Sequence, residues 1–212
     1  MRNGMKQPVI KEALGQEWDL LSQILRQHYD ITPGTASQMV MNGTIEKIDH
    51  SVIAKLFLPS SRVFGALIPY KGENIKSEVR NWTDRQNGVS MFWDRTFYFP
   101  NKRPIIFSSR MERYGDHEII EYVRYGMGLL MKISVEDSAL VFRSIGYRWK
   151  IGRFEIPIPN WALLGNAEII EKPISDKTFH VDFKIIHPLY GRTYTYSGTY
   201  TIATSDEKTD SP

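Results

Sequence analysis

From about residue 89 to residue 202, apolar and polar side chains repeatedly alternate along the chain. The clearest stretches are 89–99, 105–111, 129–136, 178–185 and 193–202. This period of two is typical of strands that bury one face. A polar second face favours antiparallel pairing over a doubly wound parallel sheet. We therefore predict an α+β fold that is mainly antiparallel β: a strongly curved sheet or open barrel of about nine or ten strands, packed on one or two helices.

A helix is predicted near residues 13–29. Its apolar face recurs every three or four positions and consists of Leu14, Trp18, Leu21, Leu25 and His28. We expect this face to pack against the sheet, with His28 at the helix C-terminus, where the helix dipole favours a protonated imidazole. A second, weaker helical pattern runs from His50 to about Phe57.

The length of 212 residues suits one domain. We expect a flexible leader over 1–12, a single β-rich domain over 13–203, and a disordered tail over 204–212, which has no apolar residue from Thr204 onward except Pro212. No linker rich in Pro, Gly or Ser divides the middle of the sequence.

Composition excludes several classes of protein. The absence of cysteine rules out disulfides, thiolate catalysis and Cys-ligated metals. The sequence shows neither a signal peptide nor an apolar run of the roughly 20 residues that a membrane-spanning helix needs. We therefore expect a cytoplasmic protein without a membrane span. Lys and Arg are interleaved with acids, and the nearest mixture of basic and aromatic residues is Arg143, Tyr147, Trp149 and Lys150, so no nucleic-acid partner is predicted.

Standard catalytic and nucleotide-binding motifs are missing, including glycine-rich phosphate loops, H-E-x-x-H and G-x-S-x-G. The nearest pair of chemically active residues on one strand face is His180 and Asp182, which is more typical of a solvated face. We predict no metal and no cofactor.

Arg95 is the most informative residue, because it shares a strand face with Trp93 and Phe97. A buried guanidinium needs a partner or a wet cavity. It could form a structural ion pair, reach water at a barrel end, or bind a carboxylate or phosphate group. Glu121 would neutralise it if Glu121 faces inward with Ile119, whereas Glu121 is solvated if the opposite face is buried. Glu168 has the same ambiguity.

A ligand site on the concave face would use one charge among aromatic side chains. Its candidate residues are Arg95, Trp93, Phe107, Glu121 and Tyr196. An aromatic stripe alone is more often core. The inward charge is what favours an apolar or amphipathic acidic ligand.

Several short motifs resemble a known family. They are Ile24–His28, Trp93–Phe97, Phe107–Ser109, Glu121, Ile156–Pro159, Ala167–Glu168, Pro188 with Gly191, and Tyr196 with Gly198. The resemblance spans roughly 14–201 and is to an uncharacterised bacterial domain-of-unknown-function family. Its members occur alone or behind saccharopine-dehydrogenase-like oxidoreductase domains. The turn at 123–125 departs from the family pattern. The resemblance implies no catalytic role, because the family has no established activity.

Three hypotheses follow. The first is a binding module that holds a small molecule in the concave sheet. The second, implied by the resemblance, is an interaction domain that docks on a separately encoded oxidoreductase. The third is an enzyme that uses Arg95 with Glu121 or Glu168 as acid–base groups. A pocket lined by Arg95 would favour the first, and a filled interior with an exposed apolar patch would favour the second.

Overall fold

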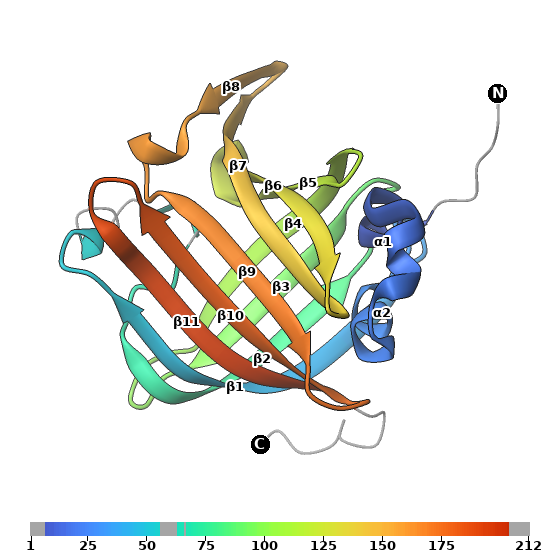
Figure 1. The fold of residues 1–212 in the computed structure, drawn as a ribbon, viewed down its shortest axis with the longest axis horizontal. Coiled ribbons are helices and arrows are strands. Elements are labelled where there is room, and N and C mark those ends of the chain that lie inside the picture. The colour runs from blue at the N-terminus through green and yellow to red at the C-terminus, as the bar shows by residue number, and fades with distance from the viewer. Residues whose placement is uncertain (1–6, 56–62, 66, 204–212) are drawn as a thin grey trace.

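A computed structural model describes residues 7–55, 63–65 and 67–203. Within these residues, eleven antiparallel strands form one sheet in the order β6-β5-β4-β3-β2-β1-β11-β10-β9-β7-β8 (Figure 1). The strands are β1 Gln38–His50, β2 Gly72–Trp82, β3 Met91–Tyr98, β4 Ile105–Gly115, β5 Glu118–Tyr122, β6 Met127–Glu136, β7 Ala139–Ile151, β8 Phe154–Ile158, β9 Asn166–Pro173, β10 Thr178–His187 and β11 Gly191–Ile202.

The sheet closes on itself. Strand β6 pairs with β5 and also with β7, and β7 pairs in turn with β9, so ten strands form a ring and β8 lies outside it. The prediction of a mainly antiparallel, strongly curved sheet packed on one or two helices is confirmed. The described residues form eleven strands, where about nine or ten were predicted. The observed barrel is closed, whereas the sequence predicted either a strongly curved sheet or an open barrel.

The closing seam is short. Strand β7 pairs with β9 only over Leu140–Arg143, opposite Glu168–Glu171. Farther along, β7 pairs with β8 over Tyr147–Ile151. The β7–β8 hairpin therefore leaves the ring and projects from one end of the barrel, as Figure 1 shows at the top.

Helices cover the other end of the barrel. They are α1 Val9–Leu14, a 3-10 helix over Gly15–Leu20, and α2 Gln23–Tyr29. Helix α1 lies against β4, β5 and β6, and α2 lies against β9 and β10.

The sequence predicted the buried face of this segment but not its breaks. All five residues of the predicted face are buried. The single helix over 13–29 is wrong, because Gly15 takes a φ of 56° and the chain is extended at Leu21. The leader is wrong for 9–12, since α1 begins at Val9 and buries Val9 and Ile10.

The second predicted helix begins later than expected. His50 ends β1 instead of starting a helix, and helical residues occur at 54–55. The rest of that prediction, over 56–57, lies outside the described residues, as do 1–6 of the leader and the tail over 204–212.

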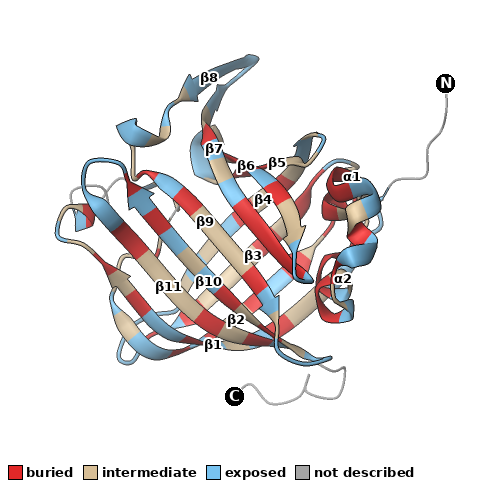
Figure 2. Ribbon diagram, in the orientation of Figure 1, coloured by how far each residue is buried: buried red, intermediate tan, exposed pale blue. Residues whose placement is uncertain are grey.

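Alternate residues of the strands in the ring face the barrel interior, and Figure 2 shows the resulting banding of buried and exposed positions. Their side chains join the helix face in one continuous core. A small second cluster of Ile120, Tyr122 and Leu130 lies on the opposite face of β5 and β6. No helix in the described part of the chain is long and apolar enough to cross a membrane.

Candidate functional site

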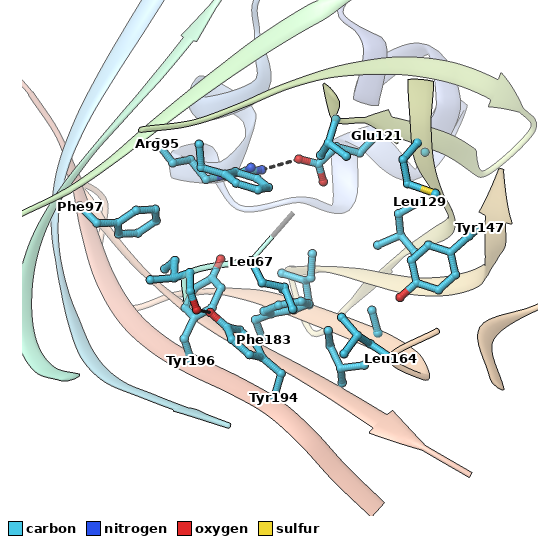
Figure 3. A pocket seen from close by; sticks show the side chains of 18 residues that line it. Leu67, Arg95, Phe97, Glu121, Leu129, Tyr147, Leu164, Phe183, Tyr194 and Tyr196 are labelled. Carbon is cyan, nitrogen blue, oxygen red and sulfur yellow. Dashed lines mark hydrogen bonds and ion pairs between the residues drawn. The ribbon is translucent and has the colours of Figure 1, made fainter. Parts of the chain in front are cut away.

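A cavity of about 120 Å³ occupies the barrel interior toward the end away from the helices (Figure 3). Its wall is made mainly of apolar and aromatic side chains. They include Leu67, Phe97, Leu129, Tyr147, Phe183 and Tyr194. Arg95 and Glu121 bring charge to this wall, and Figure 3 shows their charged groups pointing toward each other.

Arg95 and Glu121 form an ion pair inside the barrel. Arg95 lies on β3 and Glu121 on β5, and both side chains point inward from strands that flank β4. The distance from Arg95 Nη2 to Glu121 Oε1 is 2.8 Å, and the two side chains are only 13% and 10% exposed. The prediction that Arg95 points into the concave side and contacts Glu121 is confirmed.

Ser109 on β4 completes this polar cluster. Its hydroxyl donates to Glu121 Oε1 at 2.6 Å, and Arg95 Nη1 donates to Ser109 Oγ at 3.3 Å. A guanidinium has five N–H donors, and the hydrogen bonds from Arg95 to Glu121 and to Ser109 use two of them. Others remain for an acceptor brought in by a ligand.

Two aromatic rings lie close to the guanidinium. The central carbon of Arg95 lies 4.2 Å from the ring centroid of Trp93 and 5.1 Å from that of Phe107. Such contacts stabilise a cation, and more so where water is excluded. Burial is the largest single effect and disfavours the charge, but Glu121 together with Tyr196 and Tyr29 outweighs it and raises the pKa of Arg95 above its usual range. The guanidinium is therefore fixed in place and charged.

A second cavity of about 40 Å³ lies on the helix side of the ion pair. It shares Arg95, Glu121 and Tyr196 with the main cavity and is also lined by Trp93, His28 and Glu171. The ion pair therefore borders both cavities.

Glu171 is a second buried carboxyl group on the inner side. Tyr29 Oη donates to Glu171 Oε2 at 2.9 Å. Burial raises the pKa of Glu171 to about 7, although the Tyr29 hydrogen bond and Arg95 act in the opposite direction. Among the described residues, the interior therefore holds the guanidinium of Arg95 and the carboxyl groups of Glu121 and Glu171. The Glu171 carboxyl group is partly protonated near neutral pH.

His28 lies in the last turn of α2, at the C-terminal end as predicted, but the expected protonation is wrong. The ring is buried against Tyr29, Trp93 and Phe179. Burial, followed by the charge of Arg95, lowers the pKa of His28 to about 3. These effects exceed a helix-dipole contribution of at most about 2 kcal/mol.

The structure brings the five candidate residues together. Arg95, Phe107, Glu121 and Tyr196 line the main cavity, and Trp93 lines the inner one beside them. That they bind a ligand stays a prediction.

Glu168 lies elsewhere. It points to the outer surface of β9, where it binds Arg143 Nε at 3.1 Å and Lys184 Nζ at 2.5 Å. The hypothesis that Arg95 and Glu168 act together as acid–base groups of an enzyme is therefore wrong.

Sequence reasoning missed Glu171, although a signal was present. Glu171 shares a strand face with Ala167 and Ile169, which line the main cavity. Arg95 was identified as a charged residue that shares a strand face with apolar neighbours. The same argument would have identified Glu171. Tyr29, its hydrogen-bond donor, carries no comparable signal because it lies at a helix end.

His180 and Asp182 lie on the outer face of β10, with His180 Nε2 3.4 Å from Asp182 Oδ1. Over the residues that the structure describes, no group of three or more His, Cys, Asp or Glu side chains could hold a metal ion.

Comparison with known proteins finds one family and a weak similarity to a solved structure. No curated protein matches the chain. Among solved structures, the chain is similar to the S-type phycobiliprotein lyase CPES from Guillardia theta, with 12% identity, a TM-score of 0.35, and coverage of 81% of this chain and 90% of that chain. Residues 21–200 match the family described as "Domain of unknown function (DUF4166)", and the chain belongs to that family.

Proposed function

We propose that this protein is a binding module that holds an apolar or amphipathic acidic small molecule in the barrel interior. The observation that carries the proposal is a fixed guanidinium with N–H donors to spare in the wall of an otherwise apolar cavity. A ligand acid would accept from Arg95 in a charge-assisted hydrogen bond, and its apolar part would lie against the aromatic wall.

The cavity volume limits the part of the ligand that fits inside. An engineered apolar cavity of about 150 Å³ binds benzene. The main cavity, at about 120 Å³, therefore suits a group no larger than one aromatic ring or a short alkyl chain.

The charges inside the barrel set a condition on binding an acid. Glu121 already neutralises Arg95, so a ligand carboxylate adds negative charge. A pKa of about 7 lets Glu171 take up a proton and offset that charge. Acid binding should therefore be stronger at pH 6 than at pH 8.

Docking on a separately encoded oxidoreductase is the alternative implied by the family resemblance. A filled sheet interior with an exposed apolar patch would favour that hypothesis. The cavity beside Arg95 instead supports the binding module.

A thermal-shift screen of aromatic and short alkyl acids, each with its matching amide, tests the proposal. Arg95→Met alone would leave the Glu121 carboxylate buried without its partner. The test variant is therefore Arg95→Met/Glu121→Gln, which removes both charges. Arg143→Met, on the outer surface, is the matched control.

At a ligand concentration of about 100 Kd, binding should stabilise wild type and the control by about 2.7 kcal/mol. The double variant should lose most of this shift, and the amides should bind more weakly than the acids. If a ligand stabilises all three proteins equally, Arg95 does not belong to the site. If no compound stabilises wild type, the binding proposal fails.

A further inference from the structure

The β7–β8 hairpin carries one continuous apolar face. Directly opposite residues of an antiparallel pair point to the same side, and so does every second residue along a strand. The opposed pairs are Tyr147 with Ile158, Trp149 with Ile156, and Ile151 with Phe154. These six residues, which we call the hairpin face, therefore share one side. Arg148, Lys150, Glu155 and Pro157 lie on the other.

The hairpin face begins inside the barrel and ends outside it. Tyr147 lines the main cavity. Farther along, Trp149 is 36% exposed, Ile156 46% and Phe154 62%. Figure 2 shows the projecting end of the hairpin as exposed. The inner surface of the barrel thus continues beyond the cavity as an uncovered apolar strip.

Contacts on the polar side fix the hairpin in this position. Glu155 accepts from Tyr114 at 3.2 Å and lies 3.6 Å from Arg148 Nε. The Lys150 ammonium lies 5.5 Å from the ring centroid of Tyr122 on β5. The polar side is therefore held toward the outer wall at β4 and β5, while the apolar side stays open.

We propose that the hairpin face binds the apolar chain of an elongated amphipathic ligand whose acidic end lies at Arg95. This inference rests on the proposed function and names the ligand class as acids with a chain longer than the cavity. Its basis is the continuity of cavity wall and strip at Tyr147. The four residue-to-residue steps from Tyr147 to Ile151 extend the apolar surface by about 13 Å.

Strand addition by a partner protein fits this hairpin less well. Strand β8 is an edge, but Pro157 within it has no N–H to donate. The exposed apolar side chains, rather than the backbone edge, are what the hairpin offers.

The test compares a short and a long acid by calorimetric titration. Hexanoate probes the cavity, and dodecanoate probes the cavity together with the hairpin face. The variant Phe154→Ser/Ile156→Ser alters two exposed side chains and should leave the fold intact. The matched control is Ile106→Ser/Ile174→Ser, which alters two exposed isoleucines elsewhere.

Wild type and the control should bind dodecanoate more tightly than hexanoate. The hairpin variant should bind dodecanoate about tenfold more weakly, the equivalent of about two methylene groups left in water. Its affinity for hexanoate should stay within twofold of wild type.

Each other outcome decides against a specific statement. If neither acid binds wild type, the proposed function fails. If hexanoate binds but the hairpin variant leaves dodecanoate affinity unchanged, this inference is overturned and the proposed function stands. Two further measurements test other occupants of the hairpin face. Light scattering detects self-association, and sedimentation with phosphatidylglycerol vesicles detects binding to a lipid surface. If the hairpin variant loses self-association or vesicle binding without losing dodecanoate, the strip belongs to a second copy or a lipid surface, and the inference is overturned.

Discussion

Arg95 and Arg143, two of the arginines that bind carboxylates in this barrel, differ in surroundings rather than in chemistry. Arg95 pairs with Glu121 inside the barrel, whereas Arg143 is 48% exposed on its surface beside Glu136 and Glu168. Removing one partner of a buried pair leaves an uncompensated charge, which costs about 3–5 kcal/mol. An exposed pair contributes about 0–1 kcal/mol and is screened by salt.

We therefore expect Arg95→Ala to lower the free energy of unfolding by about 3–5 kcal/mol and Arg143→Ala by less than about 1 kcal/mol. Urea denaturation of both variants measures the difference. Equal losses would show that the Arg95–Glu121 pair is solvated in solution.

Glu171→Gln should change how stability depends on pH. The folded pKa of Glu171 is about 7, above its ordinary 4.5, so the proton binds the folded state more tightly. The protonated form therefore stabilises the fold, and this stability is lost as pH rises from 4.5 through about 7. Gln keeps an oxygen that can accept from Tyr29. The variant should gain about 3 kcal/mol over wild type between pH 4.5 and pH 8.

Unfolding at several pH values, compared between the two proteins, isolates this effect. The comparison is needed because His28, with its pKa lowered to about 3, contributes stability that falls as the solution is acidified below its ordinary value of 6.5. A constant difference between wild type and Glu171→Gln across this range would show that Glu171 titrates normally.

The helical segment closes one end of the barrel through its apolar face. Trp18 is 5% exposed and belongs to the same core as the strand residues. Truncating a buried indole leaves a cavity that the surroundings fill only in part, so Trp18→Ala should destabilise by about 3–5 kcal/mol. Thermal unfolding measures this loss, and an unchanged melting temperature would show that the segment is peripheral.

Strand β7 changes its inward-facing positions partway along. Leu140 and Phe142 face inward, and so does Tyr147, because the pairing with β6 shifts between Ser144 and Gly146. Ile145 is the extra residue of this bulge, and a bulge redirects the side chains that follow it.

Deletion of Ile145 would join Ser144 directly to Gly146 and restore a regular alternation, with Tyr147 still facing inward and Arg148 outward. We therefore expect the deletion variant to keep acid binding. Titration with hexanoate measures this. Loss of acid binding in the deletion variant would contradict the assignment of Ile145 as the extra residue of the bulge.

The bulge also shows where a period-two pattern stops being informative. Alternation predicted the strands, their single buried face and the inward Arg95, because each depends only on near neighbours in the chain. Alternation could not predict which residues face inward after Ile145. The break between Gly15 and Leu21 depends likewise on local backbone angles that helical spacing does not reveal.

For the whole molecule, closure of the barrel depends on contacts between distant segments. The seam joins Leu140–Arg143 to Glu168–Glu171, and no property of either segment alone specifies that pairing. The same closure brings Glu171 beside Arg95 and leaves the β7–β8 hairpin outside the ring. The candidate residues on β3, β4, β5 and β11 were identified one by one from the sequence, whereas the cavity between them required the closed sheet.

Binding inside the barrel is the central claim, and neighbouring residues on β6 test it most directly. Leu129 lines the main cavity, and Leu130 belongs to the cluster on the opposite face. The measurement is an isotope-filtered nuclear Overhauser experiment with methyl-labelled protein and bound hexanoate. We predict transfer from the ligand to the methyl groups of Leu129 and Ile169, and none to those of Leu130 or Ile120. Transfer confined to Leu130 and Ile120 would place the ligand on the outer surface and contradict binding inside the barrel.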